Sequence, residues 1–282
     1  MEVIELKSGL SRRVADWRRS GKRIGVVPTM GALHAGHISL VTAAKQASDV
    51  SVVTLFVNPT QFGPTEDLSK YPRTLQDDLR QLANAQVDAV FAPLESEVYP
   101  TGFSTFIEPP DVARQWEGTF RSTHFRGVAT VVLKLLNLTQ ADKAFFGQKD
   151  FQQICVVKRM VDDLNMPTEI VSCPTVRESD GLAMSSRNRF LSADERRIAL
   201  AIPRTLAAAE TDIRTGQRNG TSIMTTMSQS MLDSGVTQLD YAVVADPISL
   251  GVVNEIRLPV VLLVAALVGP TRLIDNVLVK DK

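Results

Sequence analysis

Two of the three histidines lie in one short loop, within the stretch VVPTMGALHAGHISLV that runs from Val26 to Val41. The apolar residues before the loop are typical of a buried strand and those after it of a helix. The start of a helix offers backbone N–H groups and the positive end of the helix dipole, which favour an anion. His34 and His37 are three positions apart, so we expect both imidazoles on one side of the first turn. With Gly36 allowing close backbone approach, the loop predicts a phosphate site.

Two other interpretations of the histidine pair stay open on this loop alone. An i, i+3 pair can be half of a metal site, although the chain has only one other histidine, His124, and no Cys or carboxylate at convincing ligand spacing nearby. The pair can also be two ordinary surface side chains at a helix start. The chain contains neither GxxxxGK[ST] nor GxGxxG. Their absence counts against a P-loop ATPase and a dinucleotide-dependent dehydrogenase.

Three further polar clusters follow apolar runs or begin a new segment. FVNPTQFG contains Gln61, FFGQKDFQQ presents Lys149 and Asp150 at a helix start, and DGLAMSSRN carries two serines and Arg187. Singly, each has an ordinary explanation as a loop amide, helix-start charges or turn formers. Together they predict His, Lys, Ser and Arg donors on loops at one edge of a sheet, which is the donor set that a triphosphate needs.

The elements that must position these loops alternate between strand and helix through about residue 175. We expect strands at 24–28, 50–57, 87–93, 143–147 and 168–173, and helices at 8–21, 37–48, 74–85, 127–138 and 150–165. Strands of continuous Val, Ile and Phe indicate a parallel sheet that is buried on both faces. The alternation therefore predicts an α/β fold, with a doubly wound, Rossmann-like domain over residues 1–175.

The pattern changes after Thr175 and predicts a smaller α+β domain over residues 176–282. Ser192 and Glu195 have the spacing of a capping box that opens a helix, and Pro203 is expected to kink this helix. A second helix is expected at 222–233, followed by three strands without intervening helices at 239–245, 258–269 and 271–279.

Charge and hydropathy exclude several classes of protein. The 282 residues include 31 Lys and Arg against 31 Asp and Glu, so no overall charge favours nucleic acid or an acidic membrane. The longest apolar run, Leu258 to Val268, is shorter than the roughly 20 residues that cross a bilayer. The N-terminus lacks the long apolar core of a signal peptide. Cys155 and Cys173 have no CxxC spacing and are expected to be reduced. We expect a cytoplasmic protein that binds neither nucleic acid nor membrane.

The motifs together resemble the pantothenate synthetase family, the ATP-dependent pantoate–β-alanine ligases, along nearly the whole chain. The matching pieces, in order, are PTMGALHAGH, FVNPTQF, YPRTLQDDL, HFRGVATVVLKLLNL, FFGQKDFQQ, DGLAMSSRN and RLIDN. This family belongs to the HxGH nucleotidylyltransferase-like superfamily. Ala35 and Gln148 differ from the residues that are commoner at these positions, and neither change removes a predicted donor.

The resemblance also implies which residues form the site. The implied catalytic side chains are His34, His37, Lys149 and Arg187. The implied ATP contacts are Met30, Gly31, Ala32, Leu33, His34, Ala35, Gly36, His37, Gly147, Gln148, Lys149, Asp150, Val176, Met184, Ser185, Ser186 and Arg187. Substrate binding is implied for Gln61 and Gln153, with Pro28, Met30 and Asn58. A segment associated with Mg²⁺ maps onto Asp77, Asp78 and Gln81.

The implied reaction has two steps. The carboxylate of (R)-pantoate attacks the α-phosphate of ATP to give pantoyl adenylate and pyrophosphate, and the amine of β-alanine then gives pantothenate and AMP. No Cys or Ser of the motifs has the His and acidic partners of a triad, so the substrate's own carboxylate is the expected nucleophile. Family resemblance implies a homodimer. Another adenylyltransferase of the superfamily, or a non-catalytic nucleotide-binding homologue, stays open as an alternative.

The basic segment RSTHFR, from Arg121 to Arg126, allows two interpretations. It can be a flap or a phosphate-side contact that closes on substrate. It can equally be a solvated loop.

Overall fold

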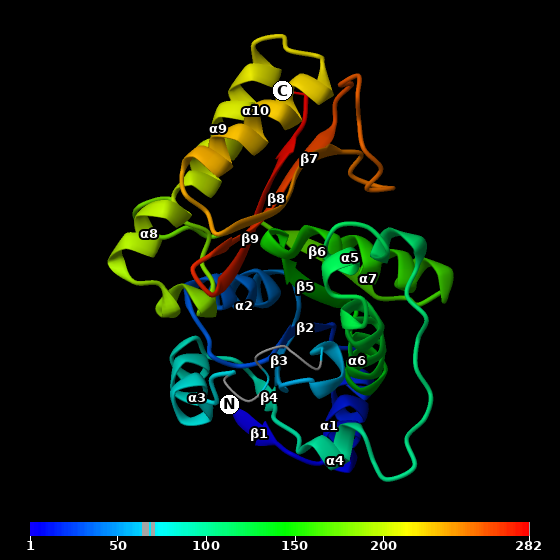
Figure 1. Ribbon diagram of the computed structural model, residues 1–282. Coiled ribbons are helices and arrows are strands. Elements are labelled where there is room, and N and C mark those ends of the chain that lie inside the picture. Colours follow the sequence, from blue (N-terminus) through cyan, green and yellow to red (C-terminus); the bar gives the residue numbers. More distant parts are fainter. Residues whose placement is uncertain (64–67, 69–70, 282) are drawn as a thin grey trace. The chain divides into compact units, whose positions relative to one another are not determined.

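Backbone contacts divide the chain into two units, which are described separately (Figure 1). The computed structural model describes residues 1–63, 68 and 71–281. The N-terminal unit comprises residues 1–148 and 152–174, and the C-terminal unit comprises residues 149–151 and 175–282. A short piece of chain just after the fifth strand thus belongs with the C-terminal unit.

A six-stranded parallel sheet forms the centre of the N-terminal unit, with the strand order β1-β4-β3-β2-β5-β6. The strands are β1 Glu2–Ile4, β2 Ile24–Thr29, β3 Val50–Leu55, β4 Ala89–Phe91, β5 Lys143–Gly147 and β6 Glu169–Cys173. The α-helices along this part of the chain are α1 Lys7–Arg19, α2 Ala35–Ala47, α3 Leu75–Asn84, α4 Glu95–Val98, α5 Glu117–Phe120, α6 His124–Thr139 and α7 Phe151–Asp163. Short 3₁₀ turns are η1 Pro59–Gln61, η3 Asp111–Ala113 and η4 Gln148–Asp150.

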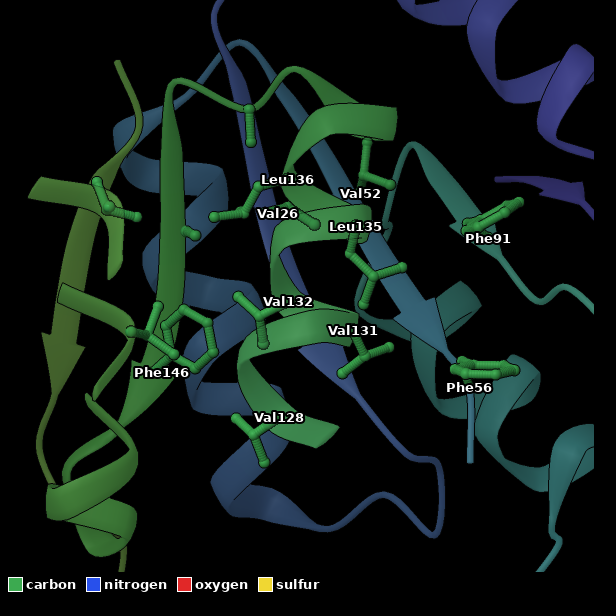
Figure 2. Packing of buried hydrophobic residues seen from close by; sticks show 14 of the residues in the cluster. Val26, Val52, Phe56, Phe91, Val128, Val131, Val132, Leu135, Leu136 and Phe146 are labelled. Carbon is green, nitrogen blue, oxygen red and sulfur yellow. The ribbon is translucent and has the colours of Figure 1, made fainter. Parts of the chain in front are cut away.

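Both faces of this sheet are buried, because successive residues of each central strand pack on opposite sides. Val26 of β2 pairs with Val52 of β3, and both join the cluster that includes α1, α6 and α7. Val27 and Val53, the next pair, join the cluster that includes α2 and α3. Figure 2 shows the first cluster, where α6 turns one apolar side toward the strands with Val128, Val131, Val132, Leu135 and Leu136. The predicted doubly wound parallel sheet is confirmed.

The C-terminal unit combines helices with a three-stranded antiparallel sheet in the order β7-β8-β9. Its strands are β7 Gln238–Ala245, β8 Val260–Val268 and β9 Thr271–Val279. Its helices are α8 Ala193–Ala199, α9 Ala201–Arg214 and α10 Gly220–Asp233, after the 3₁₀ turn η5 Ser186–Phe190. The predicted smaller α+β module is therefore confirmed.

Two local details add to the sequence-based expectation. The predicted capping box at Ser192 and Glu195 is present, and the expected kink from Pro203 is an interruption of the helix at Leu200, in the turn before the proline. Pro203 lies in the first turn of α9, where its ring would clash with the carbonyl of Ala199 in a continuous helix. The edge strand β1 was not predicted, because three residues are too few to show a periodic pattern. Among the described residues, no helix has both the length and the apolarity needed to cross a bilayer.

Candidate active site

The strand order places the histidine loop at a switch point of the sheet. From β2 the chain continues to β3 and β4 on one side, and β5 then pairs with β2 on the other side. Loops that leave the carboxyl ends of two such strands diverge, and open α/β sheets bind their ligands in the crevice between them. Residues 30–34 follow β2 and Gln148 follows β5 (Figure 1). Two of the predicted ATP-binding segments thus begin at this position.

The two histidines use their Nδ1 atoms to cap the start of α2. His34 is the N-cap residue, and its Nδ1 accepts a hydrogen bond from the backbone N–H of Gly36 at 3.1 Å. The backbone N–H of His34 in turn donates to Nδ1 of His37 at 3.3 Å. Because an Nδ1 that accepts carries no proton, the hydrogen-bond pattern assigns the N–H of both neutral rings to Nε2. With ring centroids 4.1 Å apart, the pair presents two Nε2–H donors of fixed tautomer.

Asp78 of α3 holds the loop that precedes this pair. Its carboxylate is 2% exposed and accepts from the backbone N–H of Ala32 at 3.0 Å and of Leu33 at 2.8 Å. Gly31 and Ala32 both have positive φ, 81° and 51°, which is a strained conformation for the alanine. A Cβ on Gly31 would lie 2.9 Å from Oδ2 of Asp78, so this turn requires glycine at its first position. The carboxylate therefore stabilises the left-handed turn that brings the chain to His34.

The predicted association of Asp77, Asp78 and Gln81 with Mg²⁺ does not fit this geometry. Both oxygens of Asp78 already accept hydrogen bonds, one of them also from the hydroxyl of Thr74. Asp77 is exposed and pairs with Arg80, while Gln81 donates to the carbonyl of Leu33 at 3.4 Å. Within the described part of the chain, no three His, Cys, Asp or Glu side chains group so that they could hold a metal ion.

Gln61, predicted to bind substrate, lies in η1 directly after β3 and is 7% exposed. Its Nε2 lies 3.1 Å from Sδ of Met30, so the structure brings together two predicted substrate residues from the loops after β2 and β3. Asn58 is 1% exposed and donates from Nδ2 to Oε1 of Gln61 at 3.0 Å. Pro28 lies in β2, where it pairs with Thr54 of β3. Asn58 was predicted as a substrate contact, but its burial indicates that it supports Gln61 instead of contacting the substrate.

Gln153, the other predicted pantoate residue, is half-buried on α7. Its neighbour Gln152 is buried and has a structural part that the sequence did not reveal. The Gln152 amide donates to the carbonyls of Val112 and Gln115 at 2.8 and 2.7 Å and accepts from the backbone N–H of Glu117 at 3.0 Å. It thereby fastens the segment before α6 to α7.

The basic segment from Arg121 to Arg126 is anchored at several of its residues. Arg121 donates toward Nε2 of His124 at 3.2 Å and lies 4.0 Å from the carboxylate of Glu117. His124 is 7% exposed and donates from Nδ1 to the carbonyl of Gln61 at 3.0 Å. Arg126 lies over the ring of Phe106. The interpretation as a solvated loop is wrong for His124 and Phe125, which are buried, but Ser122, Thr123 and Arg126 are exposed, and the flap stays a prediction.

In the C-terminal unit, Lys149 and the segment from Met184 to Arg187 are held by one strand. Asn276 of β9 donates from Nδ2 to the carbonyl of Lys149 at 2.9 Å. Its neighbour Asp275 is 3% exposed and forms a two-pronged ion pair with Arg177, at 2.7 and 3.2 Å. Arg177 also donates to the carbonyl of Gly181 at 3.1 Å. The residues of the motif RLIDN were assigned no role from the sequence. The adjacent polar residues Asp275 and Asn276 inside a mostly apolar strand are the sequence signal for this supporting role.

Val176 and Met184, two predicted ATP residues of this unit, lie on a hairpin that Arg177 stabilises. The backbone N–H of Met184 donates to the carbonyl of Val176 at 2.9 Å, so a hydrogen bond joins these two residues directly. The hydroxyl of Ser185 accepts from the backbone N–H of Arg187 and caps η5. Lys149, predicted to be catalytic, has its ammonium 3.4 Å from the carboxylate of Asp150.

Comparison with known proteins gives matches along the full chain. The family model described as pantoate-beta-alanine ligase matches residues 2–278. Pantothenate synthetase 1 of Bradyrhizobium diazoefficiens is 51% identical over 278 residues, which are 98% of this chain and 98% of that protein. Pantothenate synthetase of Moorella thermoacetica is 46% identical over 280 residues, with 99% of each chain covered.

Solved structures agree with the sequence relatives. A crystal structure of pantothenate synthetase from Thermus thermophilus matches with a TM-score of 0.94 and 39% identity, covering 100% of both chains. A structure of pantoate-beta-alanine ligase from Francisella tularensis, complexed with beta-gamma ATP and beta-alanine, matches with a TM-score of 0.83 and 35% identity. That match covers 100% of this chain and 99% of the other.

Proposed function

This chain belongs to the pantoate-beta-alanine ligase family, enzymes of pantothenate biosynthesis, and we propose that it condenses (R)-pantoate with β-alanine through a pantoyl adenylate. ATP is the activating substrate, and AMP and pyrophosphate are the other products. The observation that carries the proposal is the pair of Nε2–H donors on His34 and His37 at the start of α2. The Francisella tularensis relative was solved with beta-gamma ATP and beta-alanine, which supports the same substrates here.

Adenylation would begin with the histidine loop meeting the phosphates of ATP. A carboxylate that attacks the α-phosphate builds negative charge on the phosphate oxygens, and donors that are already oriented stabilise this charge without reorganising. The two Nε2–H groups and the dipole of α2 provide such donors. Lys149 and Arg187 add positive charge. Mg²⁺ would enter on the phosphates as part of the ATP substrate, because the geometry around Asp78 does not fit a protein-held ion.

The substrate carboxylate needs a pocket that orients it without neutralising it. Gln61 and Gln153 are neutral, so they can hold the hydroxy acid by hydrogen bonds and leave its carboxylate nucleophilic. A Lys or Arg in their place would bind the carboxylate more tightly and reduce its nucleophilicity. The amine of β-alanine would then attack the acyl carbon of the adenylate, with AMP as the leaving group. We also propose, from family resemblance, that the enzyme is a cytoplasmic homodimer.

An omission assay tests the proposed function. AMP formation is measured with ATP, pantoate and β-alanine together, and then with each left out in turn. We expect sustained AMP release only in the complete mixture. Sustained AMP release that needs neither pantoate nor β-alanine would assign the chain to another reaction, and no AMP in the complete mixture would favour a non-catalytic nucleotide-binding protein. Light scattering of the purified protein tests the homodimer.

A further inference from the structure

We propose that the hydroxyl of the half-buried Tyr99 positions Gln61 through Asn58, so that Gln61 offers only N–H donors to an oxygen of the hydroxy-acid substrate. The inference rests on the proposed function, in which Gln61 binds pantoate. It adds that Gln61 is the hydrogen-bond donor in that contact and the substrate is the acceptor. It also assigns Tyr99 as a positioning residue that acts through Asn58 and touches no substrate. All of these residues lie in the N-terminal unit.

The orientation of the Asn58 amide is fixed by its neighbours. The carbonyl of Gly127 lies 3.2 Å away and can only accept, so the amide atom that faces it must be Nδ2. The opposite atom, Oδ1, accepts from the hydroxyl of Tyr99 at 2.8 Å and from that of Thr60 at 2.9 Å. Donors on one side and an acceptor on the other leave a single favourable orientation for the amide.

The orientation of Asn58 then determines that of Gln61. Because Nδ2 of Asn58 also donates toward Gln61, the Gln61 atom that faces it at 3.0 Å must be the acceptor Oε1. The Nε2 of Gln61 therefore points the other way, to Sδ of Met30 in the histidine loop. A thioether is a weak acceptor, so a substrate oxygen can replace it with a gain in hydrogen-bond strength. Gln61 is thus a donor to the substrate rather than an acceptor.

The surroundings keep this arrangement rigid. A Cβ on Gly127 would lie 2.3 Å from the carbonyl oxygen of Thr60 and 2.5 Å from the backbone nitrogen of Gln61, so α6 packs on η1 with no room for a side chain. His124, one turn earlier on α6, donates to the carbonyl of Gln61. Both the backbone and the side chain of Gln61 are therefore fixed before any substrate arrives.

Tyr99 is well placed to be a permanent donor in this network. Its ring lies against Phe103 and Phe56, with centroids 4.9 and 6.0 Å away, and the ammonium of Lys134 lies 5.7 Å from its ring centroid. Burial raises the pKa of the Tyr99 hydroxyl above its ordinary value, so the proton stays on the oxygen at neutral pH. The phenol ring is held by packing on several sides, and its hydroxyl donates a hydrogen bond to the amide oxygen of Asn58.

The test measures pantoate and ATP kinetics for Tyr99→Phe, Gln61→Ala and the double variant. Tyr241→Phe, the same chemical change on β7 of the C-terminal unit, is the matched control. Loss of one neutral hydrogen bond predicts that Tyr99→Phe raises the pantoate KM by about three- to tenfold and leaves the ATP KM within about twofold. In the Gln61→Ala background, Tyr99→Phe should have no further effect on pantoate, because its only route to the substrate has been removed.

A second variant should reverse which end of the Gln61 amide faces the substrate. Asn58→Asp keeps the shape and, when ionised, can only accept, so Gln61 should turn its NH₂ toward the new carboxylate and present Oε1 to the substrate. We expect the pantoate KM to rise on the order of 10- to 100-fold, with a smaller effect on ATP. If Asn58→Asp does not fold, the double-variant cycle with Tyr99→Phe still decides the matter.

The possible results separate the positioning network from the proposed function. A Tyr99→Phe enzyme that matches Tyr241→Phe, or effects of Tyr99→Phe and Gln61→Ala that add in full, would overturn the network while leaving Gln61 as a pantoate residue. If Gln61→Ala itself leaves the pantoate KM unchanged, the assignment of Gln61 to pantoate fails, and the network falls with it.

Discussion

Replacing Asp78 by asparagine tests whether this carboxylate holds the histidine loop or binds a metal. The change keeps the size of the side chain and turns one oxygen into an NH₂ group. If the NH₂ faces Leu33, two N–H donors oppose each other in a buried site. If it faces Ala32 instead, that backbone N–H and the hydroxyl of Thr74 both lose their acceptor. Either orientation breaks a backbone hydrogen bond at the left-handed turn.

The magnitude follows from the contacts that are lost. A hydrogen bond to a charged group contributes about 1.5–3 kcal/mol, and a buried donor left without a partner costs about 1–3 kcal/mol. Partial relaxation of the loop reduces the sum, so we expect Asp78→Asn to lower the free energy of unfolding by about 2–4 kcal/mol. For a unit of this size, such a loss corresponds to roughly 4–16 °C in the thermal midpoint. The ATP KM should rise as well, because the loop no longer presents His34 in one orientation.

The assay compares thermal unfolding in EDTA with unfolding in Mg²⁺, both without ATP. Asp77→Asn is the matched control, because Asp77 is exposed and its pair with Arg80 is a surface ion pair worth under about 1 kcal/mol. We expect Asp78→Asn to be destabilised equally in both buffers and Asp77→Asn to behave like the wild type. A loss of stability seen only with Mg²⁺, or an equal shift of the Mg²⁺ requirement in both variants, would refute the structural role and restore the metal site.

The remaining predictions concern the reaction itself. His34→Ala and His37→Ala should each keep the thermal transition and lower the adenylation rate on the order of 10²- to 10³-fold; near wild-type rates would remove the role assigned to that residue. Lys149→Ala should lower kcat for adenylation, whereas a raised ATP KM alone would indicate ground-state binding only. Gln61→Ala and Gln153→Ala should raise the pantoate requirement much more than the ATP requirement; a change in ATP kinetics alone would mean that the pocket has been misplaced. Label should exchange between pyrophosphate and ATP with pantoate but without β-alanine, and ¹⁸O from the pantoate carboxylate should appear in AMP; its absence from AMP would rule out the acyl adenylate.

Periodicity was sufficient to predict the longer elements of the fold. Every predicted strand of the parallel sheet is present, because a strand buried on both faces is mostly apolar, as in β3, where all six residues are buried and only Ser51 and Thr54 are polar. The same argument fails for β1, which has three residues at the sheet edge and one buried side chain. Pro203 did indicate the helix break, which falls at Leu200 because a proline affects the turn before it rather than its own position.

The chemistry-bearing residues were easier to predict than the residues that hold them. His34 and His37 stand in a short loop between two periodic segments, where their types and spacing are visible along the chain. The partners that position such residues come from distant parts of the sequence. Asp78 lies 45 positions from Leu33, and Asp275 lies 98 positions from Arg177. No local pattern specifies such pairs, because they form only when the fold brings two elements together.

Burial gives these supporting residues a common physical signature. Asn58, Asp78 and Asp275 are each almost fully buried, and each has both ends of its polar group satisfied within the protein. A buried polar group costs free energy unless it is hydrogen-bonded, so such groups are found where a particular orientation is needed. Each of the three lies next to a predicted site segment: Asn58 on Gln61, Asp78 on the histidine loop, and Asp275 on the hairpin before Met184. The rigidity of the proposed site is thus built from carboxylates and amides that would never meet substrate, and substitutions at them should change binding without removing any reacting group.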